Sequence, residues 1–138
     1  MTHDDCLVWA RTIAGEARGE SLRGQLAVTF VPLNRSRLSY RTVVQECLKR
    51  WQFSCWNKKD ANRAFIEAMT EKELEPFLTH VYTALTGVVD PSNHATFYHV
   101  KGITPIWSIK QLLCAVIGHH IFYGNIAPYK DKMLYDVV

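Results

Sequence analysis

Apolar residues recur every three or four positions through the N-terminal two-thirds of the chain, with polar residues between them. This period places the apolar side chains on one face of a helix, so the pattern predicts a series of amphipathic helices. Gly15 and Gly87 are expected to close the first and the last of these helices, and Asp60 is expected to cap the start of the fourth. The predicted helices cover residues 6–14, 21–38, 42–49, 60–69 and 73–86.

The pattern changes after Gly87, where residues with high β-propensity gather. Gly118 separates the last two β-forming runs, which therefore fit a hairpin, although the run 112–117 taken alone also fits a helix. The expected fold class is α+β, mainly helical with a small antiparallel β-sheet in the C-terminal third. The predicted β-forming runs cover residues 95–100, 112–117 and 119–123.

The exit of the first predicted helix carries two glycines and two carboxylates. Gly15 and Gly19 each disfavour a helix by about 1 kcal/mol relative to alanine, so the helix is expected to end near Gly15. Glu16 then follows an apolar helix, where partial burial raises the pKa of a carboxyl group and suits it to donate a proton. The spacing alone favours an ordinary surface acid at the C-terminal end of a helix. Glu20 is either a second carboxylate or, as the spacing favours, a residue that caps the next helix or pairs with Arg18 or Arg23.

The composition suits one compact domain over residues 1–138, without a linker or an internal repeat. The formal net charge of +3 is too small to indicate nucleic-acid binding. No apolar run reaches the roughly 18 residues that a membrane span needs, so stable membrane insertion is not expected.

The cysteines and histidines do not form a recognised metal motif. The four cysteines lack Cys-x-x-Cys spacing, and no His-Glu-x-x-His sequence occurs. His119 and His120 would point to opposite faces of a strand. We therefore expect no metal and no cofactor. We expect the cysteines to be reduced thiols, although the sequence also allows a Cys47–Cys55 disulfide.

Five sequence blocks follow one another between residues 7 and 123. They are Ala-Arg-Thr-Ile-x-Gly-Glu-Ala-Arg-Gly-Glu at 10–20, Gly-Gln at 24–25 with Leu-Asn-Arg at 33–35, Gln-Phe-Ser-Cys-Trp-Asn at 52–57, Asp-Pro-Ser-Asn-x-Ala-Thr-x-Tyr-His at 90–99, and Trp107 with Ile-Gly-x-His-x-Phe-Tyr at 117–123. In this order the blocks resemble the cell-wall hydrolase family typified by the spore-cortex-lytic enzymes. One block would be weak evidence, whereas the ordered set is specific.

The resemblance implies a lysozyme-like fold related to the lytic transglycosylases, and cleavage of the β-1,4 bond between MurNAc and GlcNAc in peptidoglycan. It assigns the catalytic acid to Glu16. With Glu16 alone, the 6-hydroxyl of the sugar closes a 1,6-anhydro ring; with Glu20 as a second acid, water attacks instead, as in a muramidase. A zinc amidase and a non-enzymatic wall-binding module are the less favoured alternatives. The expected glycan-binding residues are Phe53, Ser54, Tyr98, His99 and Tyr123.

The chain also departs from the family pattern. Pro32 stands where an aliphatic residue is usual, and Ala14 where tyrosine is common. Residues 58–89 fit an inserted helical hairpin. The sequence shows no signal peptide and no separate wall-binding domain. It therefore resembles a bacteriophage endolysin, a monomer made in the host cytoplasm that acts on glycan strands of the wall after release.

Overall fold

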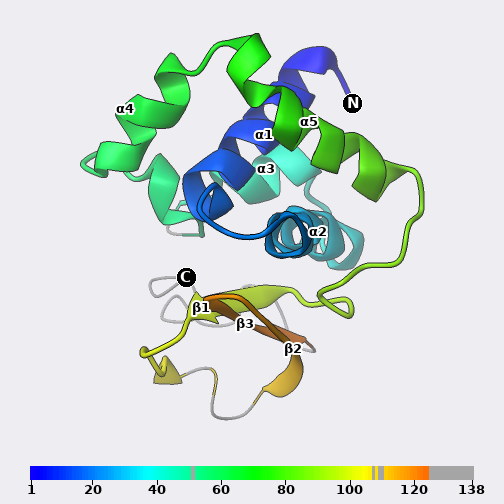
Figure 1. The fold of residues 1–138 in the computed structure, drawn as a ribbon. Coiled ribbons are helices and arrows are strands. Elements are labelled where there is room, and N and C mark those ends of the chain that lie inside the picture. Colours follow the sequence, from blue (N-terminus) through cyan, green and yellow to red (C-terminus); the bar gives the residue numbers. More distant parts are fainter. Residues whose placement is uncertain (51, 107, 109–110, 125–138) are drawn as a thin grey trace.

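The computed structural model describes residues 1–50, 52–106, 108 and 111–124, which form a helical layer above a three-stranded antiparallel sheet (Figure 1). The helices are α1 (His3–Ala17), α2 (Leu22–Leu38), α3 (Val43–Leu48), α4 (Ala61–Ala68) and α5 (Glu71–Leu85). A short 3₁₀ turn, η1 (Ser54–Trp56), precedes α4, and the strands are β1 (Phe97–Val100), β2 (Leu112–Ile117) and β3 (His120–Gly124). The predicted α+β class is confirmed. The sequence also predicts that Met133, Leu134 and Tyr135 pack back on the domain, but these residues lie outside the described part of the chain.

Side chains that satisfy free backbone N–H groups start every α-helix. Thr2, Thr42 and Thr70 each form a capping box, in which the threonine hydroxyl and the side chain three residues later exchange hydrogen bonds with the backbone. Ser21 and the predicted cap Asp60 accept hydrogen bonds from backbone N–H groups at the starts of α2 and α4. The starts of the helices are thus encoded locally.

Helix α1 lies at the centre of the helical layer and packs against each of the other helices. Its Trp9 is fully buried, and the indole N–H donates to the backbone oxygen of Thr29 in α2 at 3.1 Å. Figure 1 shows α2 between the rest of the helical layer and the sheet. Helix α2 is accordingly buried on most sides and continues through Pro32.

The end of α1 differs from the sequence-based expectation. The helix continues past Gly15 to Ala17, so the prediction that Gly15 ends it is wrong. A Cβ atom on Gly15 would lie 2.5 Å from Cβ and 2.8 Å from Sγ of Cys55. Gly15 is therefore required because η1 approaches the helix closely. Glu16 consequently lies in the last turn of α1, beside η1.

The segment from 58 to 89 is part of the core of the protein. Helices α4 and α5 both pack on α1, and their Ile66, Leu74 and Val81 are fully buried. In addition, the imidazole of His80 in α5 lies 2.9 Å from the amide oxygen of Gln25 in α2. The segment that the sequence predicts as an inserted helical hairpin thus packs around α1 as part of the domain.

The sheet has the strand order β1-β3-β2, and the predicted hairpin of β2 and β3 is confirmed. Gly118 forms its turn with φ at +58°, a conformation that glycine adopts readily. Because side chains alternate along a strand, Tyr98 and His120 face the helices, whereas His99 and Tyr123 lie on the opposite face. The prediction that His119 and His120 point to opposite faces of a strand is wrong. His119 lies in the β2–β3 turn, and Nδ1 of His119 and Nδ1 of His120 lie 2.7 Å and 3.5 Å from the two oxygens of the Glu20 carboxylate.

Buried hydrogen bonds join α2 to the segment that leads into β1. The amide of Asn34 donates to the Asp90 carboxylate at 2.8 Å and to the backbone oxygen of Ala95 at 2.9 Å. Arg35 donates to the backbone oxygen of Thr96 and to the side chain of Gln52. Three of the sequence blocks therefore meet in one polar network that sets the sheet against the helical layer.

We predict that Gly15→Ala lowers the free energy of unfolding by about 1–3 kcal/mol, because the added methyl group clashes with Cys55 and forces α1 and η1 apart. The matched control is Gly19→Ala, because a Cβ there meets no atom within 4 Å. The control is expected to be neutral or stabilising by up to about 1 kcal/mol. Urea unfolding of both variants measures the difference, and equal stabilities would contradict the close-approach explanation.

Candidate active site

Glu16 projects from the last turn of α1 towards η1. The backbone N–H of Cys55 donates to its Oε1 at 3.4 Å, a long hydrogen bond. The residue keeps partial access to solvent, although protein surrounds most of its carboxyl group. A substrate can therefore reach an acid that water solvates only poorly.

The surroundings of Glu16 favour its neutral form. Burial is the main cause that raises its pKa from 4.5 to about 7, and the negative charge of Asp60 raises it further. The contacts with Cys55 and the hydroxyl of Tyr98 act in the opposite direction and are weaker than burial. Near neutral pH the carboxyl group is thus about half protonated, so it can both donate and accept a proton.

Tyr98 brings the sheet to the same site. Its side chain is buried and faces the helices, and its hydroxyl makes no hydrogen bond of normal length among the described residues. The hydroxyl nevertheless lies close enough to Glu16 to affect the pKa of the carboxyl group. Burial and the Glu16 charge raise the pKa of Tyr98, so the phenol stays neutral and available as a hydrogen-bond donor.

Glu20 lies in a different setting, between the α1–α2 connection and the β2–β3 turn. Its Oε2 lies 2.7 Å from Nδ1 of His119, and its Oε1 accepts the backbone N–H of His119 at 2.8 Å. Burial alone would raise the pKa of Glu20, but the hydrogen bonds from the His119 side chain and backbone outweigh it and lower the pKa. A Cβ on Gly118 would come within 2.7 Å of Oε1. These contacts favour an anchoring role over the predicted role as a second acid.

Two of the alternatives for Glu20 are contradicted, since Ser21 rather than Glu20 caps α2 and Arg18 binds elsewhere. The Arg18 guanidinium donates to the backbone oxygen of Ala14 and to the side chain of Asn62, and it lies 4.3 Å from the ring centre of Phe65. Arg18 therefore closes α1 against α4.

The five expected glycan-binding residues fall into three groups. Tyr98 and Ser54 lie beside Glu16, since Ser54 directly precedes Cys55 and is partly exposed. Phe53 is only 1% exposed and packs against Tyr98, so it supports the site from within the core. His99 and Tyr123 stack on the far face of the sheet, with 2.9 Å between Nε2 and the phenol oxygen. The structure thus separates this last pair from Glu16.

Two residues at the site were not singled out from the sequence. Cys55 provides the N–H that contacts Glu16, and Asp60 provides a negative charge that adds to the effect of burial in raising the Glu16 pKa. Cys55 stands in the block at 52–57, which was the available signal. No sequence pattern pointed to Asp60 beyond its place as a helix cap.

Cys47 and Cys55, the pair that the sequence allowed to form a disulfide, are both buried free thiols in the structure.

The part of the chain that the structure describes offers neither a cluster of metal-ligating side chains nor a helix suited to cross a membrane. No group of three or more His, Cys, Asp or Glu side chains there is placed to hold a metal ion. None of the described helices combines the length and the apolar character needed to cross a bilayer.

Comparisons with known proteins place these features in a family. Residues 19–123 match the sequence model of the family described as Cell Wall Hydrolase, so the match begins three residues after Glu16. A comparison with curated proteins gave no match.

Two solved structures are similar over most of their length. One is the catalytic domain of the germination-specific lytic transglycosylase SleB from Bacillus anthracis, with 25% identity, a TM-score of 0.67, and coverage of 90% of this chain and 97% of that chain. The other is the catalytic domain of the Bacillus cereus SleB protein, with 24% identity, a TM-score of 0.67, and coverage of 90% and 92%. These similarities confirm the fold expected from the sequence blocks.

The raised pKa of Glu16 makes the stability of the protein depend on pH. Because the folded pKa of about 7 exceeds the ordinary value of 4.5, the folded state holds a proton that the unfolded chain releases. The resulting stability is complete below pH 4.5 and is lost as the pH rises through 7. We predict that Glu16→Gln removes this loss, so the variant gains about 3 kcal/mol relative to the native protein between pH 4.5 and 8. Urea unfolding across this range measures the gain, and parallel pH profiles would contradict the assignment.

Proposed function

The chain belongs to the cell wall hydrolase family, and we propose that it cleaves the β-1,4 bond between MurNAc and GlcNAc in peptidoglycan, with Glu16 as the proton donor. One observation carries this proposal: a partly accessible glutamic acid whose pKa is raised to about 7 mainly by burial. A carboxyl group that is still protonated near neutral pH is what the leaving glycosidic oxygen requires.

The proposed reaction begins with the neutral carboxyl group of Glu16. It gives its proton to the glycosidic oxygen as the bond from that oxygen to C1 of MurNAc breaks. Positive charge then develops at C1 and the ring oxygen. The Glu16 carboxylate left behind takes the proton of the MurNAc 6-hydroxyl, and O6 bonds to C1. This step yields a 1,6-anhydro product and returns Glu16 to its protonated form.

Transglycosylation is favoured over hydrolysis by the position of the second candidate acid. A muramidase needs a second carboxylate that acts as nucleophile or as base towards water. Both oxygens of Glu20 are occupied by His119, and its lowered pKa makes it a weak base. The similar protein from Bacillus anthracis is also described as a lytic transglycosylase. Glu16 therefore serves as acid and as base in turn.

The predicted glycan-binding residues take different roles in this proposal. Ser54 is partly exposed beside Glu16 and is placed to contact sugar hydroxyls, whereas the buried Tyr98 acts through its contact with the Glu16 carboxyl group. Phe53 fixes the Tyr98 ring. The stacked His99 and Tyr123 hold β1 against β3, which keeps Tyr98 at the site.

The biological setting stays a prediction from the sequence. A bacteriophage endolysin made in the host cytoplasm would lyse cells only after a second protein opens the membrane. Expression alone and together with a membrane-permeabilising protein distinguishes the cases, because lysis on expression alone would contradict this setting. The predicted monomeric state is testable by sedimentation.

We predict that Glu16→Gln lowers the rate of peptidoglycan cleavage by at least about 100-fold, because the amide keeps the shape of the side chain but cannot donate the proton. Mass spectrometry of the native digest is expected to show 1,6-anhydro-MurNAc ends. The matched variant Glu20→Gln is expected to retain cleavage with the same products.

Three outcomes would contradict parts of this account. Cleavage by the Glu16→Gln variant at the native rate would remove Glu16 as the acid. Reducing MurNAc ends would indicate a muramidase. Reducing ends together with loss of cleavage in Glu20→Gln would assign the second acid to Glu20. Circular dichroism checks that both variants are folded.

A further inference from the structure

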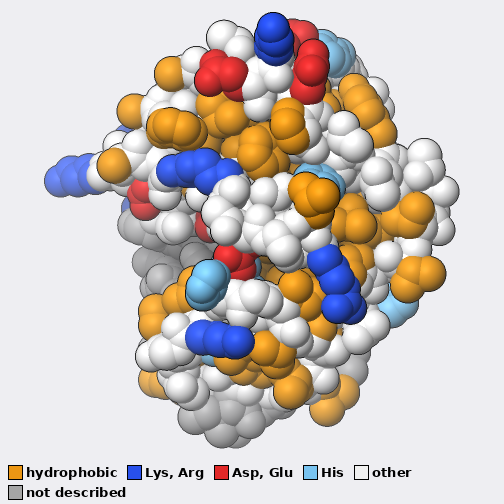
Figure 2. Space-filling model, viewed as in Figure 1, with side chains coloured by type: hydrophobic (Ala, Val, Ile, Leu, Met, Phe, Trp, Pro, Cys, Tyr) orange, Lys and Arg blue, Asp and Glu red, His pale blue; other side chains and the backbone are white. Residues whose placement is uncertain are grey.

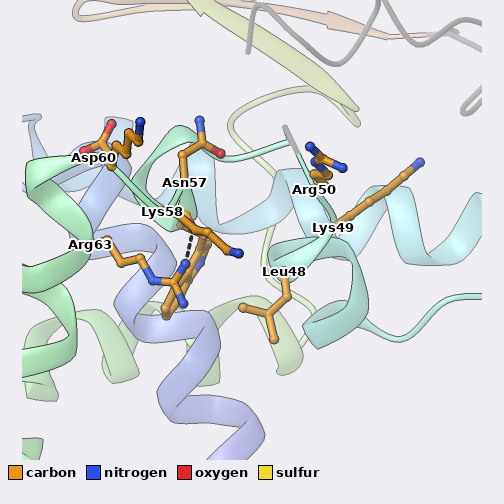
Figure 3. A pocket seen from close by; sticks show the side chains of 9 residues that line it. Leu48, Lys49, Arg50, Asn57, Lys58, Asp60 and Arg63 are labelled. Atoms are coloured by element: carbon orange, nitrogen blue, oxygen red, sulfur yellow. Dashed lines mark hydrogen bonds between the residues drawn. The ribbon is translucent and has the colours of Figure 1, made fainter.

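A basic pocket opens beside the proposed active site, between the end of α3 and the start of α4 (Figure 3). Its volume is about 850 Å³, within the range of small-molecule binding sites. Figure 3 shows Leu48, Lys49 and Arg50 on one side of the pocket and Asp60 and Arg63 on the other. The remaining lining residues are Trp56, Asn57, Lys58 and Lys59.

The pocket concentrates positive charge far beyond the average of the protein. Five of its nine lining residues are lysine or arginine and one is aspartate, which gives a formal charge of +4, against +3 for the whole chain. On the face shown in Figure 2, by contrast, lysine and arginine side chains stand in small separate groups. Like charges held together repel one another, so such a cluster disfavours folding unless an anion neutralises it.

Among the described residues, the protein leaves the positive charges of Lys58 and Lys59 unpaired. Asp60 is committed to capping α4 through the backbone N–H of Asn62, and Arg63 pairs with Glu67 outside the pocket. The side chains of Lys58 and Lys59 are exposed and make no ion pair or hydrogen bond within the described ranges. These two ammonium groups are therefore available to a bound anion.

The pocket and the proposed acid share one short loop. Trp56 lines the pocket, and the preceding residue, Cys55, donates its N–H to Glu16. The Trp56 indole is fixed by a 2.8 Å hydrogen bond to Thr12, and Arg63 donates to the Trp56 backbone oxygen. A ligand in the pocket would thus lie next to the sugar that Glu16 acts on, along a wall that is held rigid.

We propose that this pocket binds the carboxylates of the peptide stem that MurNAc carries. The inference rests on the proposed function, because a glycan strand placed at Glu16 brings its peptide stems with it. A stem has free carboxylates on a flexible chain, which matches several ammonium and guanidinium groups around a roomy cavity. Binding the stem beside the scissile bond positions the MurNAc ring at the acid.

The state of Lys49 agrees with an anionic occupant. Burial lowers the pKa of Lys49 to about 8, and the positive charge of Arg41 lowers it further. A bound carboxylate would compensate for both effects. The bound carboxylate would therefore raise the pKa of Lys49 and favour the ammonium form that binds the ligand.

The test uses the Glu16→Gln variant, which leaves the wall intact, and measures co-sedimentation with insoluble peptidoglycan stripped of phosphate-containing polymers. Two double substitutions are compared in this background: Lys58→Gln with Lys59→Gln in the pocket, and Lys72→Gln with Lys101→Gln at exposed positions elsewhere. Both remove two positive charges. The pocket variant is expected to bind about fivefold more weakly and the control about as well as its parent. Glycan strands freed of their peptide stems are expected to bind the Glu16→Gln parent, the pocket variant and the control variant equally.

Each result bears on the proposal. Equal binding of the pocket and control variants to stem-bearing peptidoglycan would overturn it, because the charges would then act only through the net charge. A pocket defect that persists on stem-free strands would also overturn it. A defect seen only on walls that retain phosphodiester polymers would assign the pocket to phosphate instead. Failure of the native protein to cleave glycan would refute the proposed function but would leave this binding result standing.

Discussion

The contact between α1 and η1 at Gly15 is the constraint on which the site depends. A glycine lets Cys55 approach the helix more closely than any Cβ would allow. That approach places the Cys55 N–H against Glu16 and excludes most water from its carboxyl group. The same short turn continues through Trp56 into the wall of the basic pocket. The close approach of the Cys55 side chain to Gly15 thus places η1, and with it one wall of the basic pocket, beside Glu16.

Polar contacts hold the sheet against the helices around Glu16. The residues that make these contacts take no direct part in the proposed reaction. Asn34 and Arg35 tie α2 to the chain before β1, while Glu20 ties the α1–α2 connection to the β2–β3 turn. The hydrogen bonds of Asn34 and Arg35 are buried, and together with that of Glu20 they orient the strand that carries Tyr98. The residues of the ordered blocks therefore serve mostly to position the helical layer and the sheet around Glu16.

Much of this arrangement follows from the sequence, because helix caps and β-forming runs are local signals. Asp60 as a cap and Gly118 as a hairpin turn were predicted from such signals, and the structure confirms both. The purpose of Gly15 was not predictable, since only the tertiary approach of Cys55 explains it. Alternation along β1 separates His99 from Tyr98, but the face that meets the helices depends on packing across the whole domain. The partner of Glu20 lies 99 residues away and was likewise beyond local reasoning.

The central claim is that the folded protein keeps Glu16 protonated close to neutral pH. The most direct measurement is an NMR titration of the glutamate side-chain carboxyl carbons, with the Glu16 signal assigned by its absence in Glu16→Gln. The account predicts a midpoint near pH 7 for this one signal. A midpoint at or below 4.5 would mean that burial does not govern the carboxyl group, and it would contradict the assignment of Glu16 as the proton donor.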